Sequence, residues 1–188
     1  MNPLAIIVTC CIAAAILWLP RKHALTPLIL GVVFLPPYNA VSIGSINLPA
    51  LRLLLLCLLI RMLVRNEAHP IPGSKLDRYV MIWAVWMTIS YLALTFNASA
   101  IINRMGTVWV DLVLAYFLCR RYMTDLPSIV RTGYVLVGVT CALAISTSME
   151  YFKGFNVFSV IGGMNWVQVR GETTRCQGPF GHPISLGS

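Results

Sequence analysis

The residues best suited to chemistry lie close together near the end of the chain. The segment 169–188 reads VRGETTRCQGPFGHPISLGS and contains Arg170, Glu172, Arg175 and His182. A guanidinium group presents a fixed fork of donors that can hold two phosphate oxygens at once, and it stays charged when partly desolvated. These residue types favour the binding of an anion that carries phosphate groups.

His182 is the candidate catalytic base of this segment. It lies between Gly181 and Pro183, and proline suits the first position of a helix, so the histidine is expected at a helix start. Backbone amides at a helix start favour anions. A capping or hydrogen-bonding role is the alternative. Gly178 and Gly181 allow a tight turn, which serves either ligand approach or the return of the chain into an apolar helix.

The composition sets the class of protein in which this segment must work. Of 188 residues, 58% are hydrophobic and 11% are charged, which excludes a soluble domain because too much apolar surface would face water. We therefore predict an all-α integral membrane protein, a polytopic bundle of about six complete transmembrane helices and the start of a seventh. The six cysteines lack ligand spacing, so we expect no metal and no cofactor.

Six apolar runs are long enough to be predicted as membrane crossings: 3–20, 24–43, 48–64, 79–96, 100–119 and 132–152. The second run contains Pro27 and the pair Pro36-Pro37, so its outer part is expected to be kinked or unwound. A seventh crossing is expected to begin near Pro183. The predicted divisions are a helical bundle, an outer loop and the start of the seventh helix, over residues 1–152, 153–178 and 179–188.

The basic residues predict the orientation of the bundle. Nine of the 14 Lys and Arg residues lie in the loops 21–23, 61–78 and 120–131, which the positive-inside rule assigns to the cytoplasm. This role in topology explains the net charge of +8, and we expect no nucleic-acid partner. The segments predicted to lie outside are the amino terminus, 39–47, 97–99 and 153–178.

Five cationic residues remain on the predicted outer side, where the rule should deplete positive charge: Arg52, Arg104, Lys153, Arg170 and Arg175. An anionic ligand at the membrane surface explains them, most simply a phosphate or diphosphate head group on a lipid. We predict that the four arginines bind this group. The alternative is that Arg52 and Arg104 snorkel from helix ends while Arg170 and Arg175 pair with Glu172 or with lipid phosphate.

Two acidic residues are candidate supporting residues of the site. Asp111 lies seven residues after Arg104 and therefore on the same helix face. A carboxylate within a membrane is costly and needs a partner or water, and the alternative for Asp111 is a structural contact with Arg52 or a tyrosine. Glu150 is expected at the outer end of its helix, either in the site or in solvent.

The pattern R-x4-R-x2-GPFGHP-x2-LG over residues 170–188 resembles a stretch of the O-antigen ligase and O-antigen polymerase superfamily, which are bacterial inner-membrane glycosyltransferases. Further features are similar to the amino-terminal half of that family: a leucine-rich third run with Arg52, the sequence 104–106 before an apolar helix that ends at Arg120, and a loop with Asp125. Family members have more helices and a second large outer loop, so we expect this chain to be an incomplete fragment.

The resemblance implies transfer of a glycan from an undecaprenyl diphosphate carrier to a glycan or lipid A-core acceptor, on the periplasmic face of the inner membrane. It implies no metal and no nucleotide. Arg170 and Arg175 match the arginines of the motif and would hold the diphosphate. The family's histidine comes from the second outer loop and has no counterpart here, so the resemblance assigns no role to His182.

The chemistry agrees with these residue types, because arginines can neutralise the charge that develops on a departing diphosphate. One alternative is a transporter or flippase of lipid-linked sugars or another anion. A transporter is expected to carry charged groups at both faces or at the midplane, together with internal repeats. Another alternative is an inactive membrane remnant.

The orientation can be tested by labelling. Cys176 is predicted outside the cytoplasm, so it should react with a membrane-impermeant thiol reagent applied to intact cells. A cysteine introduced by Ser74→Cys should react only after permeabilisation. Reversed labelling would overturn the predicted orientation.

Overall fold

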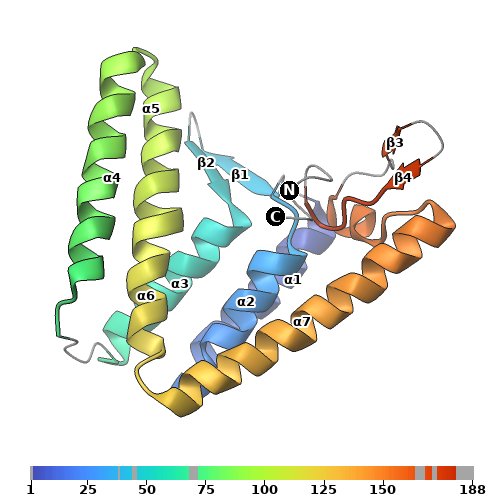
Figure 1. Cartoon of the computed structure of the whole chain (residues 1–188), viewed down its shortest axis with the longest axis horizontal. Helices are drawn as coiled ribbons and strands as arrows, with labels where there is room; N and C mark the ends of the chain where they lie inside the picture. The colour runs from blue at the N-terminus through green and yellow to red at the C-terminus, as the bar shows by residue number, and fades with distance from the viewer. Residues whose placement is uncertain are drawn as a thin grey trace.

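The computed structural model describes residues 2–37, 39–43, 46–67, 72–163, 168–170 and 173–180, and gives the backbone only at residues 42–43, 46, 168–170 and 173–175, which include Arg170 and Arg175. The fold is all-α (Figure 1). Its long helices are α1 (Pro3–Trp18), α2 (Leu25–Phe34), α3 (Ala50–Val64), α4 (Lys75–Leu94) and α7 (Leu126–Lys153). A further continuous helix combines α5 (Ala98–Met105), the π-helical segment η2 (Gly106–Leu114) and α6 (Ala115–Tyr122), so the described part contains six helices.

Short irregular elements join these helices. The segments η1 (Arg21–His23) and η3 (Val157–Ile161) are 3₁₀ turns. The strands β1 (Ala40–Ile43) and β2 (Ile46–Pro49) form an antiparallel hairpin with Ala40 opposite Pro49. The strands β3 (Gln168–Arg170) and β4 (Thr173–Arg175) form a second hairpin. The sequence predicts polar turns in these regions, and neither hairpin was anticipated.

The helix ends follow from local chemistry. The expected unwinding of the run 24–43 is confirmed, because α2 already ends at Phe34, ahead of the pair Pro36-Pro37. The predicted start of the sixth run, Thr132, is wrong by six residues, because Asp125 occupies the N-cap position of α7 and a proline is accepted in its first turn. At its other end, α7 stops at Gly154, which adopts a left-handed conformation with φ +63°.

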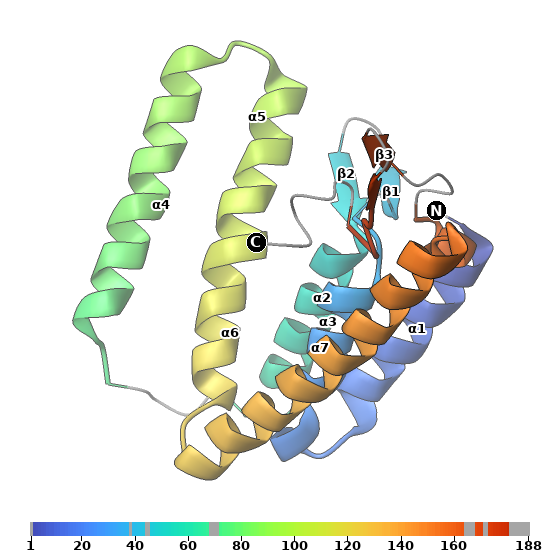
Figure 2. The same ribbon diagram turned by 45° about the vertical axis from the view of Figure 1, so that its right-hand side comes forward.

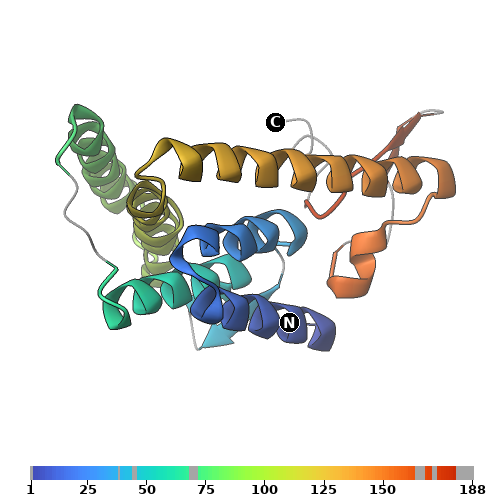
Figure 3. The same ribbon diagram turned by 90° about the horizontal axis from the view of Figure 1, so that it is seen from below.

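The core lies among α1, α2 and α3, and α7 lies across this group and contacts α2 (Figure 3). Ile16, Leu54 and Leu58 are completely buried in it. Gly31 allows the close approach of α2 to α3, because a Cβ atom there would overlap the side chain of Leu54. The helices α4 and α5–α6 form a separate antiparallel pair beside this core (Figure 2).

Two helices are long and apolar enough to cross a membrane, Ala98–Tyr122 and α7. By length and composition they qualify as spans, and only 6% of the apolar window of α7 is buried inside the molecule. Much of its surface is therefore apolar and uncovered. The other described helices are shorter or less apolar than these two.

Buried Arg61 joins three helices at the end where α1 and α3 finish. Its Nη1 donates to the carbonyl oxygens of Ile16 and Leu19 (2.7 Å to Leu19), which belong to the last turn and C-cap of α1. Its Nη2 and Nε bind the Glu67 carboxylate at 3.0 and 3.2 Å. The Tyr122 hydroxyl donates to the same carboxylate at 2.8 Å. Arg61 thus satisfies carbonyl groups that a helix end leaves unpaired.

A second ion pair fastens the start of α4 to α6. Ser74 and Asp77 form a reciprocal capping box at the start of α4. Asp77 also accepts hydrogen bonds from Arg120 and from the Tyr116 hydroxyl, the latter at 2.9 Å. The same carboxylate therefore begins one helix and holds its neighbour.

Hydrogen bonds also connect two of the predicted cytoplasmic segments, 21–23 and 120–131, at this end of the molecule. Arg21 Nη2 donates to the carbonyl oxygen of Arg121 at 3.1 Å. Arg131 Nη1 donates to the carbonyl oxygen of Lys22 at 3.0 Å. The loops after α1 and after α6 are consequently in direct contact.

The segments predicted to lie outside meet at the opposite end. Asn2 Nδ2 donates to the carbonyl oxygen of Val160 at 3.1 Å, and Asn39 Nδ2 donates to that of Ile161 at 2.7 Å. The amino terminus, the β1–β2 hairpin and the turn η3 therefore form one end.

The Arg61–Glu67 pair predicts how stability depends on pH. Burial raises the pKa of Glu67, but hydrogen bonds from Arg61 and Tyr122 and the charges of Arg61 and Arg65 outweigh it, so the pKa lies below its ordinary value. A carboxylate whose pKa is lowered by folding stabilises the fold above its unfolded pKa of ~4.3, and this contribution is lost as the pH falls through the folded pKa. We expect Glu67→Gln to cost about 2 kcal/mol at pH 7.

The measurement is the Tm of the detergent-purified protein at a series of pH values. The wild type should lose stability more steeply than Glu67→Gln between about pH 5 and pH 3, so that the two curves converge. Parallel curves over this range would show that Glu67 is not held as a paired carboxylate.

Candidate functional site

Two of the predicted phosphate-binding arginines, Arg52 and Arg104, line one cavity. We call this cavity the Arg104 pocket; it has a volume of about 340 Å³, and its lining residues are Asn47, Pro49, Arg52, Tyr91, Ala100, Asn103, Arg104 and Thr107. The residues come from β2, the start of α3, the end of α4 and the α5–η2 helix. The pocket therefore lies at the end of the molecule predicted to face outward.

Arg52 is 6% exposed, and its guanidinium group is held by protein atoms. Its Nε donates to both Asp111 carboxylate oxygens, at 2.9 and 3.1 Å, and Nη2 reaches Asp111 at 3.0 Å. Nη2 also donates to the Thr107 hydroxyl at 2.9 Å and to the Asn103 carbonyl at 3.2 Å, while Nη1 donates to the Asn47 carbonyl at 3.0 Å. Of the two interpretations of Asp111, the structural contact with Arg52 is the one observed.

The helix is shaped to receive this guanidinium. A Cβ atom at position 106 would overlap Nη1 and Cζ of Arg52, so Gly106 lets the group lie against the helix backbone. The π-helical segment η2 starts at this glycine, and such segments are common at functional sites. Helix α3 is thereby fixed to the long helix at the floor of the pocket.

Arg104 differs from Arg52 in being exposed and carrying no ion pair with any described residue. Its Cζ lies 5.8 Å from the ring centroid of Tyr91 on α4. A cation over an aromatic face is held loosely, by about 0.5–1 kcal/mol at an exposed site. Arg104 is thus oriented over the pocket while its hydrogen-bond donors are available to a ligand.

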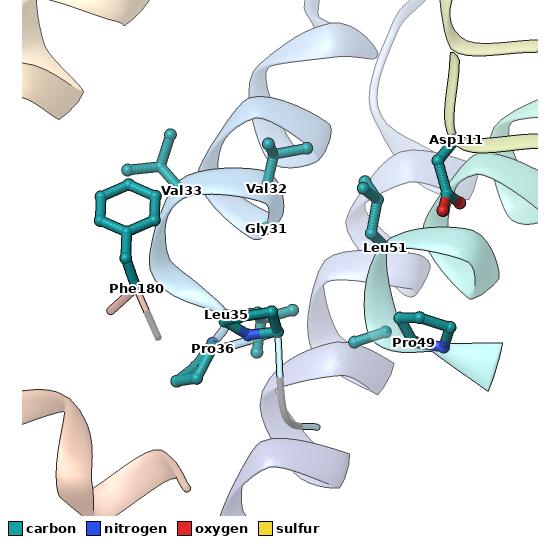
Figure 4. Close-up of a pocket in the computed structure, with 11 residues that line it drawn as sticks. Gly31, Val32, Val33, Leu35, Pro36, Pro49, Leu51, Asp111 and Phe180 are labelled. Carbon is teal, nitrogen blue, oxygen red and sulfur yellow. The ribbon is translucent and has the colours of Figure 1, made fainter. Parts of the chain in front are cut away.

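An apolar groove adjoins the pocket on the other side of the Arg52–Asp111 pair. The groove has a volume of about 240 Å³ and is lined by Gly31, Val32, Val33, Leu35, Pro36, Pro37, Pro49, Ala50, Leu51, Asp111 and Phe180 (Figure 4). Pro49 lines both cavities, and Asp111 supplies the one carboxylate of the groove. A polar pocket and an apolar groove therefore share one wall.

Glu150 holds the chain segment that brings Phe180 to this groove. Its side chain is buried, and its carboxylate accepts the backbone N–H groups of Gln177 at 3.0 Å and Gly178 at 2.8 Å. Asn156 Nδ2 donates to the Gly178 carbonyl at 2.8 Å. Glu150 and Gly178, both predicted as supporting residues, are brought together, and the solvent-exposed alternative for Glu150 is wrong.

Cys176 directly precedes the two residues that Glu150 binds, and it is half-buried. Its Sγ lies 3.4 Å from the carbonyl oxygen of Thr147. Burial and the nearby charge of Glu150 raise the pKa of the thiol. Labelling of Cys176 should therefore be slow at neutral pH and faster in alkaline buffer.

The remaining predicted site residues lie at or beyond the edge of the described part. Arg170 and Arg175 occupy the facing strands β3 and β4, opposite Thr173 and Gln168 respectively. Their side chains, together with the whole of Gly181 and His182, lie outside the described residues. Within the described part, no group of three or more His, Cys, Asp or Glu side chains could hold a metal ion.

The contact of Arg52 with Asp111 was one of the predicted alternatives, whereas its contacts with Asn103 and Thr107 were not predicted, although a signal for them exists. Asn103, Thr107 and Asp111 recur every four residues and therefore lie on one face of an otherwise apolar helix. A stripe of this kind indicates a polar seam against another helix. No family model matches the chain, and comparisons with curated proteins and with solved structures give no match.

The Arg52–Asp111 pair predicts a strongly non-additive response to mutation. Asp111→Leu alone leaves a buried guanidinium without its counter-ion and should cost about 3–5 kcal/mol. Arg52→Met combined with Asp111→Leu removes both charges and should cost clearly less than the sum of the single changes. Thermal unfolding of the single and double variants in detergent measures this coupling, and additive losses would contradict a direct pair.

Proposed function

We propose that the chain belongs to a membrane glycosyltransferase of the O-antigen ligase or polymerase type, and that the Arg104 pocket binds the diphosphate of its lipid-linked donor. The observation that carries this proposal is one exposed arginine, without a described ion pair, over a polar pocket that adjoins an apolar groove. A lipid diphosphate presents the same combination of an anionic group and a hydrocarbon chain.

The proposal places the chain as a polytopic bundle in the bacterial inner membrane. Two long apolar helices and the uncovered apolar surface of α7 support a membrane environment. The basic loops meet at one end and Arg104 lies at the other. With the positive-inside rule this arrangement favours a cytoplasmic basic end and a periplasmic Arg104 pocket.

The residues take different roles in this proposal. Arg52 is neutralised by Asp111 and shapes the floor of the pocket, whereas Arg104 contacts the diphosphate. As the bond between the sugar and the diphosphate breaks, negative charge grows on the leaving oxygen, and a guanidinium stabilises it where water is scarce. Arg170 and Arg175 would add charge from the outer segment, and His182 would act as the base for the acceptor hydroxyl of a glycan or a lipid A-core.

The experiment separates the fork geometry of Arg104 from its charge. Arg104→Gln should weaken binding of undecaprenyl diphosphate about tenfold, or about 1.4 kcal/mol, in native mass spectrometry of the detergent-purified chain. Arg104→Lys keeps the charge but loses the bidentate geometry, so it should lower glycan transfer more than binding. Arg78→Gln removes an exposed arginine from the start of α4 and serves as the matched control.

Transfer is scored by the new glycosidic linkage, with purified lipid-linked glycan and acceptor. A carrier or flippase would lose binding and translocation together in Arg104→Gln and form no such linkage. If Arg104→Gln and Arg78→Gln bind the lipid diphosphate equally well, the Arg104 pocket is not the donor site.

A further inference from the structure

A second polar cavity lies at the opposite end of the long helix from the Arg104 pocket. We call it the basic pocket; it has a volume of about 280 Å³ and is lined by Arg21, Lys22, Tyr122, Thr124, Asp125, Ser128 and Arg131. It is formed by η1, the end of α6 and the start of α7. The stretch of this helix from Arg104 to Tyr122 separates the two pockets by roughly 27 Å.

The walls of the basic pocket are fixed by hydrogen bonds between its own segments. Arg21 reaches the Arg121 carbonyl and Arg131 reaches the Lys22 carbonyl, each through one terminal nitrogen. The second terminal nitrogen of each of these guanidinium groups makes no hydrogen bond among the described residues. Lys22 is exposed, and its ammonium group makes no hydrogen bond among the described residues.

The charges of the pocket favour an anion. Three cationic side chains face one carboxylate, that of Asp125, which accepts a hydrogen bond from the Ser128 hydroxyl at 2.7 Å. Asp125 is also the N-cap residue of α7. Guanidinium and ammonium groups are donors suited to phosphate oxygens.

The surface beside the pocket is apolar. Three side chains at the start of α7, Leu126, Ile129 and Val130, are 72%, 52% and 46% exposed. Trp18, in the last turn of α1, is 86% exposed. A ligand with a phosphate group in the pocket could therefore lay hydrocarbon along the adjoining helix surface.

From this juxtaposition we infer that the basic pocket binds the phosphate group of an anionic phospholipid. The inference goes beyond the proposed transfer reaction, because neither Arg104 nor the apolar groove takes part. Basic pockets between helices at the cytoplasmic side suit such head groups. The lipid bridges η1 and α7, and it thereby stabilises the contact between the loops after α1 and α6.

The test uses the detergent-purified chain and native mass spectrometry with phosphatidylglycerol or phosphatidylcholine. Phosphatidylglycerol should be retained in preference, and Lys22→Gln and Arg131→Gln should each weaken its binding about fivefold. Arg131→Lys should keep most of the affinity. Asp125→Asn should strengthen binding, because it removes the opposing charge. Arg78→Gln, which changes the charge outside the pocket, should have no effect.

A second arm measures the Tm with millimolar inorganic phosphate and no added lipid. Stabilisation by phosphate that Lys22→Gln abolishes, without preference between the two lipids, would assign the site to a soluble phosphate compound and overturn the lipid inference. Equal retention of both lipids with no response to phosphate would overturn the site altogether. Lys22→Gln removes no described hydrogen bond, so an unchanged Tm without ligand shows that any loss of binding is not a folding defect.

Discussion

The ion pair between Arg52 and Asp111 is the interaction on which the arrangement of the outer end depends. It crosses from the first turn of α3 to the middle of the long helix, and it forms the wall between the Arg104 pocket and the apolar groove. A buried guanidinium without a carboxylate would be prohibitively costly, so neither helix can move independently of the other. The pair also leaves Arg104, one helical turn before Thr107, as the exposed cation of the pocket.

Much of the fold could be predicted from the sequence, because helices obey local rules. Apolar runs, the pair Pro36-Pro37 and the Ser74–Asp77 capping box each act within a few residues. The hairpins were not predicted, because short polar segments show little periodicity. The earlier start of α7 was not predicted either, because Asp125 is equally common as a loop residue and as an N-cap.

The candidate site was only partly predictable, for a different reason. Charge asymmetry singled out Arg52 and Arg104, yet Arg52 is neutralised by partners 51 to 59 residues away, in a fold that periodicity does not specify. A contact between Arg52 and Asp111 was one of the alternatives that the sequence left open, because their separation of 59 residues does not decide among them. The stripe of Asn103, Thr107 and Asp111 carries that information only once the facing helix is known.

The hydrogen bonds from Gln177 and Gly178 to Glu150 mean that α7 positions the segment that follows Cys176. Because one carboxylate binds the amide groups of Gln177 and Gly178, this segment is attached to the end of α7, and Phe180 reaches the groove from that attachment point. The position of the Phe180 ring therefore depends on the length of α7. One helical turn added to α7 would shift the attachment point at Glu150 by about 5.4 Å. This shift is enough to uncover or obstruct the groove without any change in the residues that line it.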